Sequence, residues 1–127
     1  MPKKIVSTSD APRAVGPYSQ AVRAGGFLFI SGQVGIDPAT GTLVPGGFEA
    51  EAQQVLSNLQ AILAAEGLSP GHLVKTTVFL ADLQNFPRLN EIYRDFAGDS
   101  PPARSTIQAT ALPLDAQIEI EAVALAD

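Results

Sequence analysis

One stretch decides the fold: FLFISGQV, residues 27–34. Aromatic and β-branched residues are enriched in strands, and successive side chains of a strand point to opposite faces of the sheet. Phe27 and Phe29 therefore lie on one face, whereas Leu28, Ile30 and Val34 lie on the other. Because both faces carry apolar groups, we expect this strand to belong to a sheet that is covered on both sides.

The segments around this strand predict more of the sheet. Gly25-Gly26 follows a second strand-like segment over residues 19–24, and two glycines suit the positive φ angles of a two-residue hairpin turn. Residues 35–47 are rich in turn formers. Further strands are predicted over residues 4–7, 72–81, 103–109 and 117–126.

Two helices are predicted between these strands. Apolar residues recur at three- and four-residue spacings from Phe48 to Leu63, and Gly67 is placed to end this helix. A second apolar stripe follows over residues 86–96, with Asn85 in the position of an N-cap. Strands interleaved with two helices on a short chain predict an α+β fold with both helices on one face of the sheet.

The face of the sheet without helices needs another cover. Apolar residues are predicted there on the strands that start at Phe27 and His72, and at Val123 and Leu125. A second copy of the chain is the simplest cover. We therefore predict a homo-oligomer whose sheets pack together, with a functional site between subunits.

The composition narrows the chemistry. The chain has 127 residues, of which 46% are hydrophobic and 17% charged, as expected of one folded domain over residues 1–127. It contains no cysteine and one histidine, His72, which we expect at the surface. Disulfides, thiolate metal sites and cysteine nucleophiles are therefore excluded, and we expect no metal site.

The charge and the hydropathy limit the partners. A net charge of −5 with scattered basic residues argues against nucleic acid. No apolar run approaches the ~20 residues that span a membrane, and residues 1–4 lead into a strand-like segment without the apolar region of a signal peptide. We therefore expect a cytoplasmic protein with no membrane partner.

Arg104 and two glutamates are the first candidates for a site. Arg104 enters its strand after two prolines, and a guanidinium binds a carboxylate through two parallel hydrogen bonds. Glu119 and Glu121 share the face of the last strand that points away from the helices. If the last two strands pair as a hairpin, Arg104 lies beside Glu119 or Glu121, and an ion pair with a purely structural role is the alternative to a binding site.

Other polar groups could face a ligand. Tyr18 and Ser31-Gly32 could present hydroxyl and backbone groups, and Asn90 stands between apolar positions of the second helix. Each of these residues also has an interpretation without a function. Tyr18 would be a half-buried tyrosine, Ser31 a serine at a strand end and Asn90 a polar residue on a helix face.

Five ordered motifs together resemble the RidA/YjgF family of small reactive-intermediate deaminases, over nearly the whole chain. They are GPYSQA at 16–21, ISGQVGIDP at 30–38, the segment 85–93, PARS at 102–105 and IEIEA at 118–122. The resemblance implies a chorismate-mutase-like two-layer sandwich, with a six-stranded mixed sheet and two helices on one face. It also implies a trimeric barrel with three sites between subunits.

The resemblance also implies an activity, the hydrolysis of 2-imino acids from pyridoxal-phosphate-dependent dehydratases to 2-keto acids and ammonia, without a cofactor. Arg104 would bind the substrate carboxylate and Glu119 would hold the attacking water. The pocket would be lined by Tyr18, Ser31, Gly32, Asn90 and Thr106. Thr106 stands where many family members have cysteine, and its backbone carbonyl could still contact the imine nitrogen.

Two other functions remain open at this point. One is a non-catalytic module that binds a small metabolite in the same pocket, and Arg104 alone fits either function. The other is the ribonuclease or translation-inhibiting activity ascribed to some relatives, which the acidic charge balance and the absence of a basic stripe disfavour.

Overall fold

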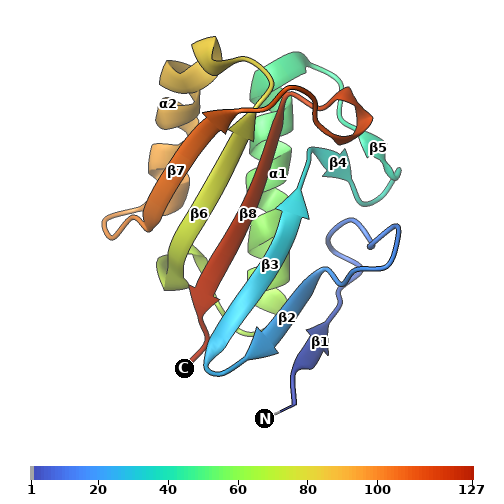
Figure 1. Cartoon of the computed structure of the whole chain (residues 1–127), viewed down its shortest axis with the longest axis vertical. Coiled ribbons are helices and arrows are strands. Elements are labelled where there is room, and N and C mark those ends of the chain that lie inside the picture. Colours follow the sequence, from blue (N-terminus) through green and yellow to red (C-terminus); the bar gives the residue numbers. More distant parts are fainter. Residues whose placement is uncertain (1) are drawn as a thin grey trace.

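Six strands form one mixed sheet in the computed structural model, which describes residues 2–127, and both long helices lie on one face of this sheet (Figure 1). This arrangement confirms the predicted α+β class. The sheet strands are β1 (Lys4–Val6), β2 (Ala21–Ala24), β3 (Phe27–Gln33), β6 (Leu73–Leu80), β7 (Ala103–Gln108) and β8 (Ile118–Leu125). A separate small hairpin consists of β4 (Ile36–Asp37) and β5 (Thr42–Leu43). The helices are α1 (Gly47–Ala65) and α2 (Phe86–Ala97), with short 3₁₀ turns η1 (Pro70–His72), η2 (Leu83–Asn85) and η3 (Pro113–Asp115).

The strand order is β1-β2-β3-β8-β6-β7, and only β6 and β7 pair in parallel. Helix α2 connects these two strands, and a helical crossover brings the chain back in the same direction. The last two strands therefore do not pair as a hairpin, which was the condition for placing Arg104 beside Glu119 or Glu121. Because β6 lies between β7 and β8, Arg104 is not a cross-strand neighbour of Glu119 or Glu121.

The core lies between the helices and one face of the sheet. Leu59, Ile62 and Leu63 of α1 are fully buried there, and so are Ile118 and Ile120 of β8. Full burial of such a side chain contributes about 1.5–3 kcal/mol relative to exposure. The periodic positions of the helices and strands therefore supply most of the apolar burial.

The ends of the helices are only partly as predicted. Gly67 ends α1 with a φ of 72°, and its N–H donates to Ala64 O at 3.0 Å, while the next N–H, of Leu68, donates to Leu63 O at 2.9 Å. Asn85 stands at the N-cap of α2, but its side chain forms no capping hydrogen bond. Instead, the Asp82 carboxylate accepts the Gln84 N–H at 2.9 Å in the preceding η2 turn.

The face without helices carries apolar groups, as predicted. Phe27 and Phe29 are exposed on it in the single chain, whereas Leu28 and Ile30 of the same strand are buried against the helices. Regular alternation over residues 72–81 predicts that Val74 lies on the same face as Thr76. This was wrong, because an irregularity between Leu73 and Lys75 shifts the register against β8. Leu73 is buried and Val74 is exposed, the reverse of a regular alternation.

No helix among residues 2–127 is long and apolar enough to cross a lipid bilayer. The same residues contain no group of three or more histidine, aspartate or glutamate side chains placed to hold a metal ion. His72 is exposed at the start of β6, as predicted, and its Nδ1 accepts the Ser69 N–H at 3.1 Å.

Candidate functional site

The side chain of Arg104 points toward the helices. Arg104 lies beside Thr76 in the parallel register of β7 and β6, and Thr76 is fully buried beneath α2. The guanidinium Nη2 donates a hydrogen bond to Oδ1 of Asn90, on α2, at 2.7 Å. The structure therefore brings two predicted site residues, Arg104 and Asn90, into direct contact.

Two aromatic rings of α2 also hold the guanidinium. The Arg104 Cζ lies 4.8 Å from the ring centroid of Tyr93 and 5.4 Å from that of Phe86. A guanidinium within about 6 Å of a ring face is attracted by the ring quadrupole. Asn90, Tyr93 and Arg104 are called the arginine side below. Phe86 and Tyr93 were predicted only as members of the apolar stripe of the helix, and their contact with Arg104 was not predicted.

Tyr93 is itself fixed in place. Its hydroxyl lies 2.6 Å from Oγ1 of Thr76 in the core. Burial raises the pKa of the Tyr93 phenol above its ordinary value, so the ring stays neutral at physiological pH. The three-residue spacing from Asn90 to Tyr93 on one helix is the signal that could have predicted their common role.

Arg104 keeps donors free for a ligand. Within residues 2–127, no carboxylate forms an ion pair with its half-buried guanidinium. One of its five N–H donors is satisfied by Asn90. A cavity of about 320 Å³ opens beside both residues. Thr106 follows on the same face of β7, and its Oγ1 is buried with no hydrogen-bond partner in the described chain.

A second group of predicted residues lies on the opposite face of the sheet. Tyr18, Gly32 and Glu119 line a cavity of about 460 Å³, called the glutamate cavity below. Glu119 alternates with the fully buried Ile118 and Ile120, so its carboxylate points away from the helices, as predicted.

Gly32 allows the Glu119 carboxylate to lie against the backbone of β3. A Cβ atom at residue 32 would lie 2.9 Å from the carboxyl carbon of Glu119, closer than van der Waals contact allows. The register of β3 against β8 shifts between Ile30 and Gln33, which places an extra residue at this point. Glycine at the bulge therefore makes room for the carboxylate.

The environment of Glu119 changes its acidity. Burial, and then the charge of Glu121 on the same face, raises the pKa of the Glu119 carboxyl above its ordinary value. The start of β8 is held by Glu51, a buried residue of α1 whose Oε1 accepts the Gln117 N–H at 2.8 Å. This hydrogen bond lies two residues before Glu119 and was not predicted from the sequence.

The N-terminal loop forms one wall of the glutamate cavity. The buried Gln20 pins this loop, since its Oε1 accepts the Thr8 N–H at 2.7 Å and its Nε2 donates to Pro12 O at 2.8 Å. The Tyr18 hydroxyl accepts the Val15 N–H at 3.2 Å, at the exposed rim. Gln20 belongs to the GPYSQA motif, but its role could not be derived from the motif alone.

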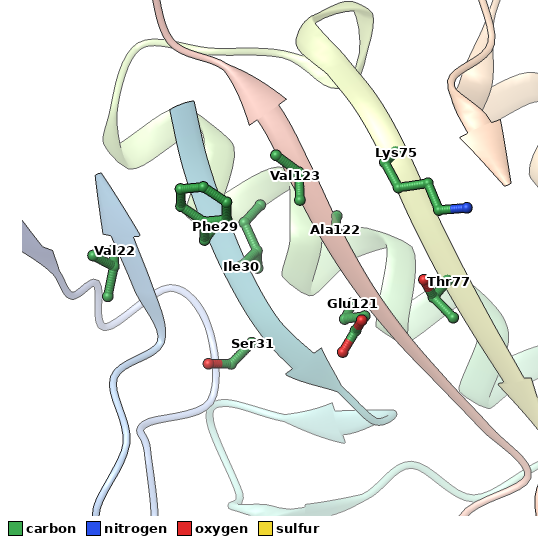
Figure 2. Close-up of a pocket in the computed structure, with 9 residues that line it drawn as sticks. All are labelled: Val22, Phe29, Ile30, Ser31, Lys75, Thr77, Glu121, Ala122 and Val123. Carbon is green, nitrogen blue, oxygen red and sulfur yellow. The ribbon is translucent and has the colours of Figure 1, made fainter. Parts of the chain in front are cut away.

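Ser31 faces a different hollow of the helix-free face. Its Oγ donates to Ser19 O at 2.6 Å and so ties the bulge to the N-terminal loop. Figure 2 shows Ser31, Glu121 and Thr77 on this face, around a cavity of about 310 Å³. Ser31 thus supports the loop and does not line the glutamate cavity.

The predicted site residues therefore form two groups within one chain. Arg104 and Thr106 face the helices, where Arg104 contacts Asn90 of α2, and Glu119 with Gly32 faces the opposite side of the sheet. A single chain does not bring Arg104 and Glu119 together.

Comparison with known proteins identifies the family. The sequence model of the endoribonuclease L-PSP family matches residues 8–126. The 2-iminobutanoate/2-iminopropanoate deaminase of Mus musculus is 51% identical over 123 residues, covering 97% of this chain and 91% of the mouse protein. The chain therefore belongs to the endoribonuclease L-PSP family, which is the RidA/YjgF family.

Solved structures agree with this assignment. The crystal structure of RidA from an Antarctic Psychrobacter has a TM-score of 0.92 and 43% identity, covering 96% of this chain and 98% of that one. The structure of E. coli TdcF with bound serine has a TM-score of 0.89 and 43% identity, with the same coverage. The names of these relatives differ, although their fold is shared.

Proposed function

We propose that this protein hydrolyses 2-imino acids to 2-keto acids and ammonia. The observation that carries this proposal is the Arg104 guanidinium, which is held by Asn90 and two aromatic rings while no carboxylate among the described residues neutralises it. Such a group is ready to bind a substrate carboxylate. The name of the mouse relative and the serine bound to TdcF support this class of substrate, since serine carries a carboxylate beside a nitrogen-bearing carbon.

The complete site is proposed to lie between subunits of a homotrimer. Arg104 and Glu119 lie on opposite faces of the sheet, and a small imino acid is too short to reach both across it. Arg104 of one subunit would therefore meet the glutamate cavity of another. The exposed Phe27 and Phe29 support the same assembly, because packing of two sheets would cover them. Three copies are what the family resemblance implies.

Hydrolysis needs little beyond positioning. Arg104 holds the carboxylate next to C2 of the protonated imine. Glu119 accepts a proton from water as the water oxygen bonds to C2, and its raised pKa brings this carboxylate closer to the pH at which it works as a base. The carboxylic acid returns the proton to the amine nitrogen, and the C2–nitrogen bond breaks. The keto group then forms as its hydroxyl proton leaves with ammonia, as ammonium.

A non-catalytic binding module is the alternative. Arg104 and Asn90 suit it equally well, because they account only for binding. Glu119 favours hydrolysis, since a half-buried carboxylate with a raised pKa is not needed to bind an anion. The acidic net charge of −5 again disfavours an RNA substrate.

The test couples D-amino acid oxidase to the protein and follows the imine with a semicarbazide trap. We expect the wild type to lower semicarbazone formation and Arg104→Ala to abolish this effect. Arg104→Lys keeps the charge without the planar fork and should lower kcat/KM roughly 10- to 100-fold. Arg88→Ala is the control, because Arg88 is an exposed arginine of α2 paired with Glu49 and Glu91. No effect of the wild type, or full activity of Arg104→Ala, contradicts the proposal.

A further inference from the structure

We propose that this site acts on 2-imino acids with an extended apolar side chain, and that Val15 and Leu114 bind this side chain. The inference rests on the proposed function and names its substrate class. It starts from the exposed apolar residues of the chain. Val15 is 77% exposed and Leu114 is 63% exposed, the two highest values among the large exposed apolar residues of the described chain, and both line the glutamate cavity.

Leu114 lies on the cavity wall in an unfavourable backbone conformation. Leu114 and Asp115 have φ angles of 59° and 57°, and no other non-glycine residue in the described chain has a positive φ. This conformation is unfavourable at a residue other than glycine, and such strain concentrates at functional sites. The turn is closed by Ala116 N–H, which donates to Pro113 O at 3.1 Å. A large apolar group is thus kept on the cavity wall, where glycine would relieve the strain.

Val15 is presented from the other wall. Its backbone N–H donates to the Tyr18 hydroxyl at 3.2 Å, and the loop before it is pinned by Gln20 through Thr8 and Pro12. Both apolar groups therefore stand on anchored segments around the carboxylate of Glu119. An apolar side chain attached to C2 of the substrate would cover them when C2 lies at Glu119.

The size of the cavity supports a side chain longer than methyl. Its volume of about 460 Å³ is many times the roughly 30 Å³ that a water molecule occupies. In the single chain, before the neighbouring subunit that would supply Arg104 is added, such a volume has room for the reacting carbon, its water and several methylene groups. Another copy of the chain is the competing occupant, because a neighbouring subunit could also cover Val15 and Leu114.

The first experiment compares two imines that differ only in the side chain. D-amino acid oxidase makes them from D-alanine and D-leucine, and C2 of the imino acid has no stereocentre. We expect the wild type to have the higher kcat/KM for the leucine-derived imine, and Leu114→Asn to lower the ratio of the two values about tenfold. Val15→Asn should act in the same direction. Leu83→Asn is the matched control, because Leu83 is a leucine, 44% exposed, outside this cavity, and should leave the ratio unchanged.

The second experiment measures binding of the stable products by calorimetry. The wild type should bind 4-methyl-2-oxopentanoate more tightly than pyruvate, and Leu114→Asn should remove about tenfold of that preference. An equal loss for both acids, or a change in oligomer mass by sedimentation, would mean that Leu114 packs against another copy and would overturn the inference. A wild type that hydrolyses neither imine contradicts the proposed function instead. Hydrolysis of both imines with the same ratio in Leu114→Asn contradicts only this inference.

Discussion

The arginine side and the glutamate cavity are built in different ways. The arginine side stands on regular elements, β7 and α2, and Arg104 is held by side-chain contacts with Asn90 and Tyr93. The glutamate cavity is walled by loops, and these are held by Gln20 and by the turn at Leu114. Rigid elements suit a group that every 2-imino acid shares, the carboxylate, whereas loops can vary with the side chain of the substrate. We therefore assign binding of the substrate carboxylate to the arginine side. We assign the hydrolytic step and the selection of the substrate side chain to the glutamate cavity.

The largest effect on the hydrolysis rate is expected from a substitution in the glutamate cavity. Glu119→Gln preserves the shape of the side chain but removes the proton acceptor, and loss of a general base lowers the rate by roughly 10²- to 10⁴-fold. The binding of 2-oxobutanoate should change little, because Arg104, and not Glu119, is proposed to bind the carboxylate of this ligand. Steady-state kinetics and calorimetry on the same preparation test both statements. If kcat is retained, or if binding and kcat fall together, the two regions do not have separate roles.

A smaller effect, on KM, is expected from a substitution on the arginine side. Tyr93→Leu removes the ring that faces the guanidinium and should raise KM roughly 3- to 30-fold, with the change in KM rather than in kcat. Tyr93→Phe is the matched variant, because it keeps the ring and loses only the hydroxyl that contacts Thr76. It should lower the free energy of unfolding by about 1–3 kcal/mol and leave KM close to the wild-type value. Equal KM values for the two variants would show that the ring does not position Arg104.

The parts of the fold that depend on local periodicity could be predicted from the sequence. The alternation in residues 27–30, the apolar stripe of α1 and the stop at Gly67 are all confirmed, because each depends on neighbours a few residues away. The partner of β7 depends on the path of α2 across the sheet, which no local pattern contains. The hairpin considered for the last two strands does not form for this reason.

The candidate site shows the same limit. The face of Glu119 followed from its alternation with Ile118 and Ile120, and this prediction is confirmed. The separation of Glu119 from Arg104 required the strand order. Leu114 could not be predicted as part of the cavity. Leucine rarely adopts a positive φ, and the residues beside it in the sequence do not indicate that Leu114 has one. The catalytic roles of Arg104 and Glu119 stay predictions until kinetics test them.

The smallest expected effect concerns the charge of Glu121. This carboxylate lies on the same face as Glu119 and is the second cause, after burial, of the raised pKa of Glu119. The rate falls as pH drops through that pKa, because the protonated carboxyl accepts no proton from water. Removing a like charge lowers the pKa, so Glu121→Gln should move the acidic limb of kcat/KM to lower pH, by a fraction of a pH unit, while the alkaline limb stays in place.

The pH profile of kcat/KM for the alanine-derived imine, measured at constant ionic strength, checks this shift. Glu91→Gln is the matched control, since Glu91 is exposed on α2, pairs with Arg88 and lies on the other side of the sheet from Glu119. A shift to higher pH, or the same shift in Glu91→Gln, would mean that the acidic limb does not report Glu119. Because burial is the larger cause of the raised pKa, the acidic limb in Glu121→Gln should stay well above the pH range of an ordinary glutamate. A limb that returned fully to the pH range of an ordinary glutamate would assign the raised pKa to the charge of Glu121 and not to the walls of the glutamate cavity.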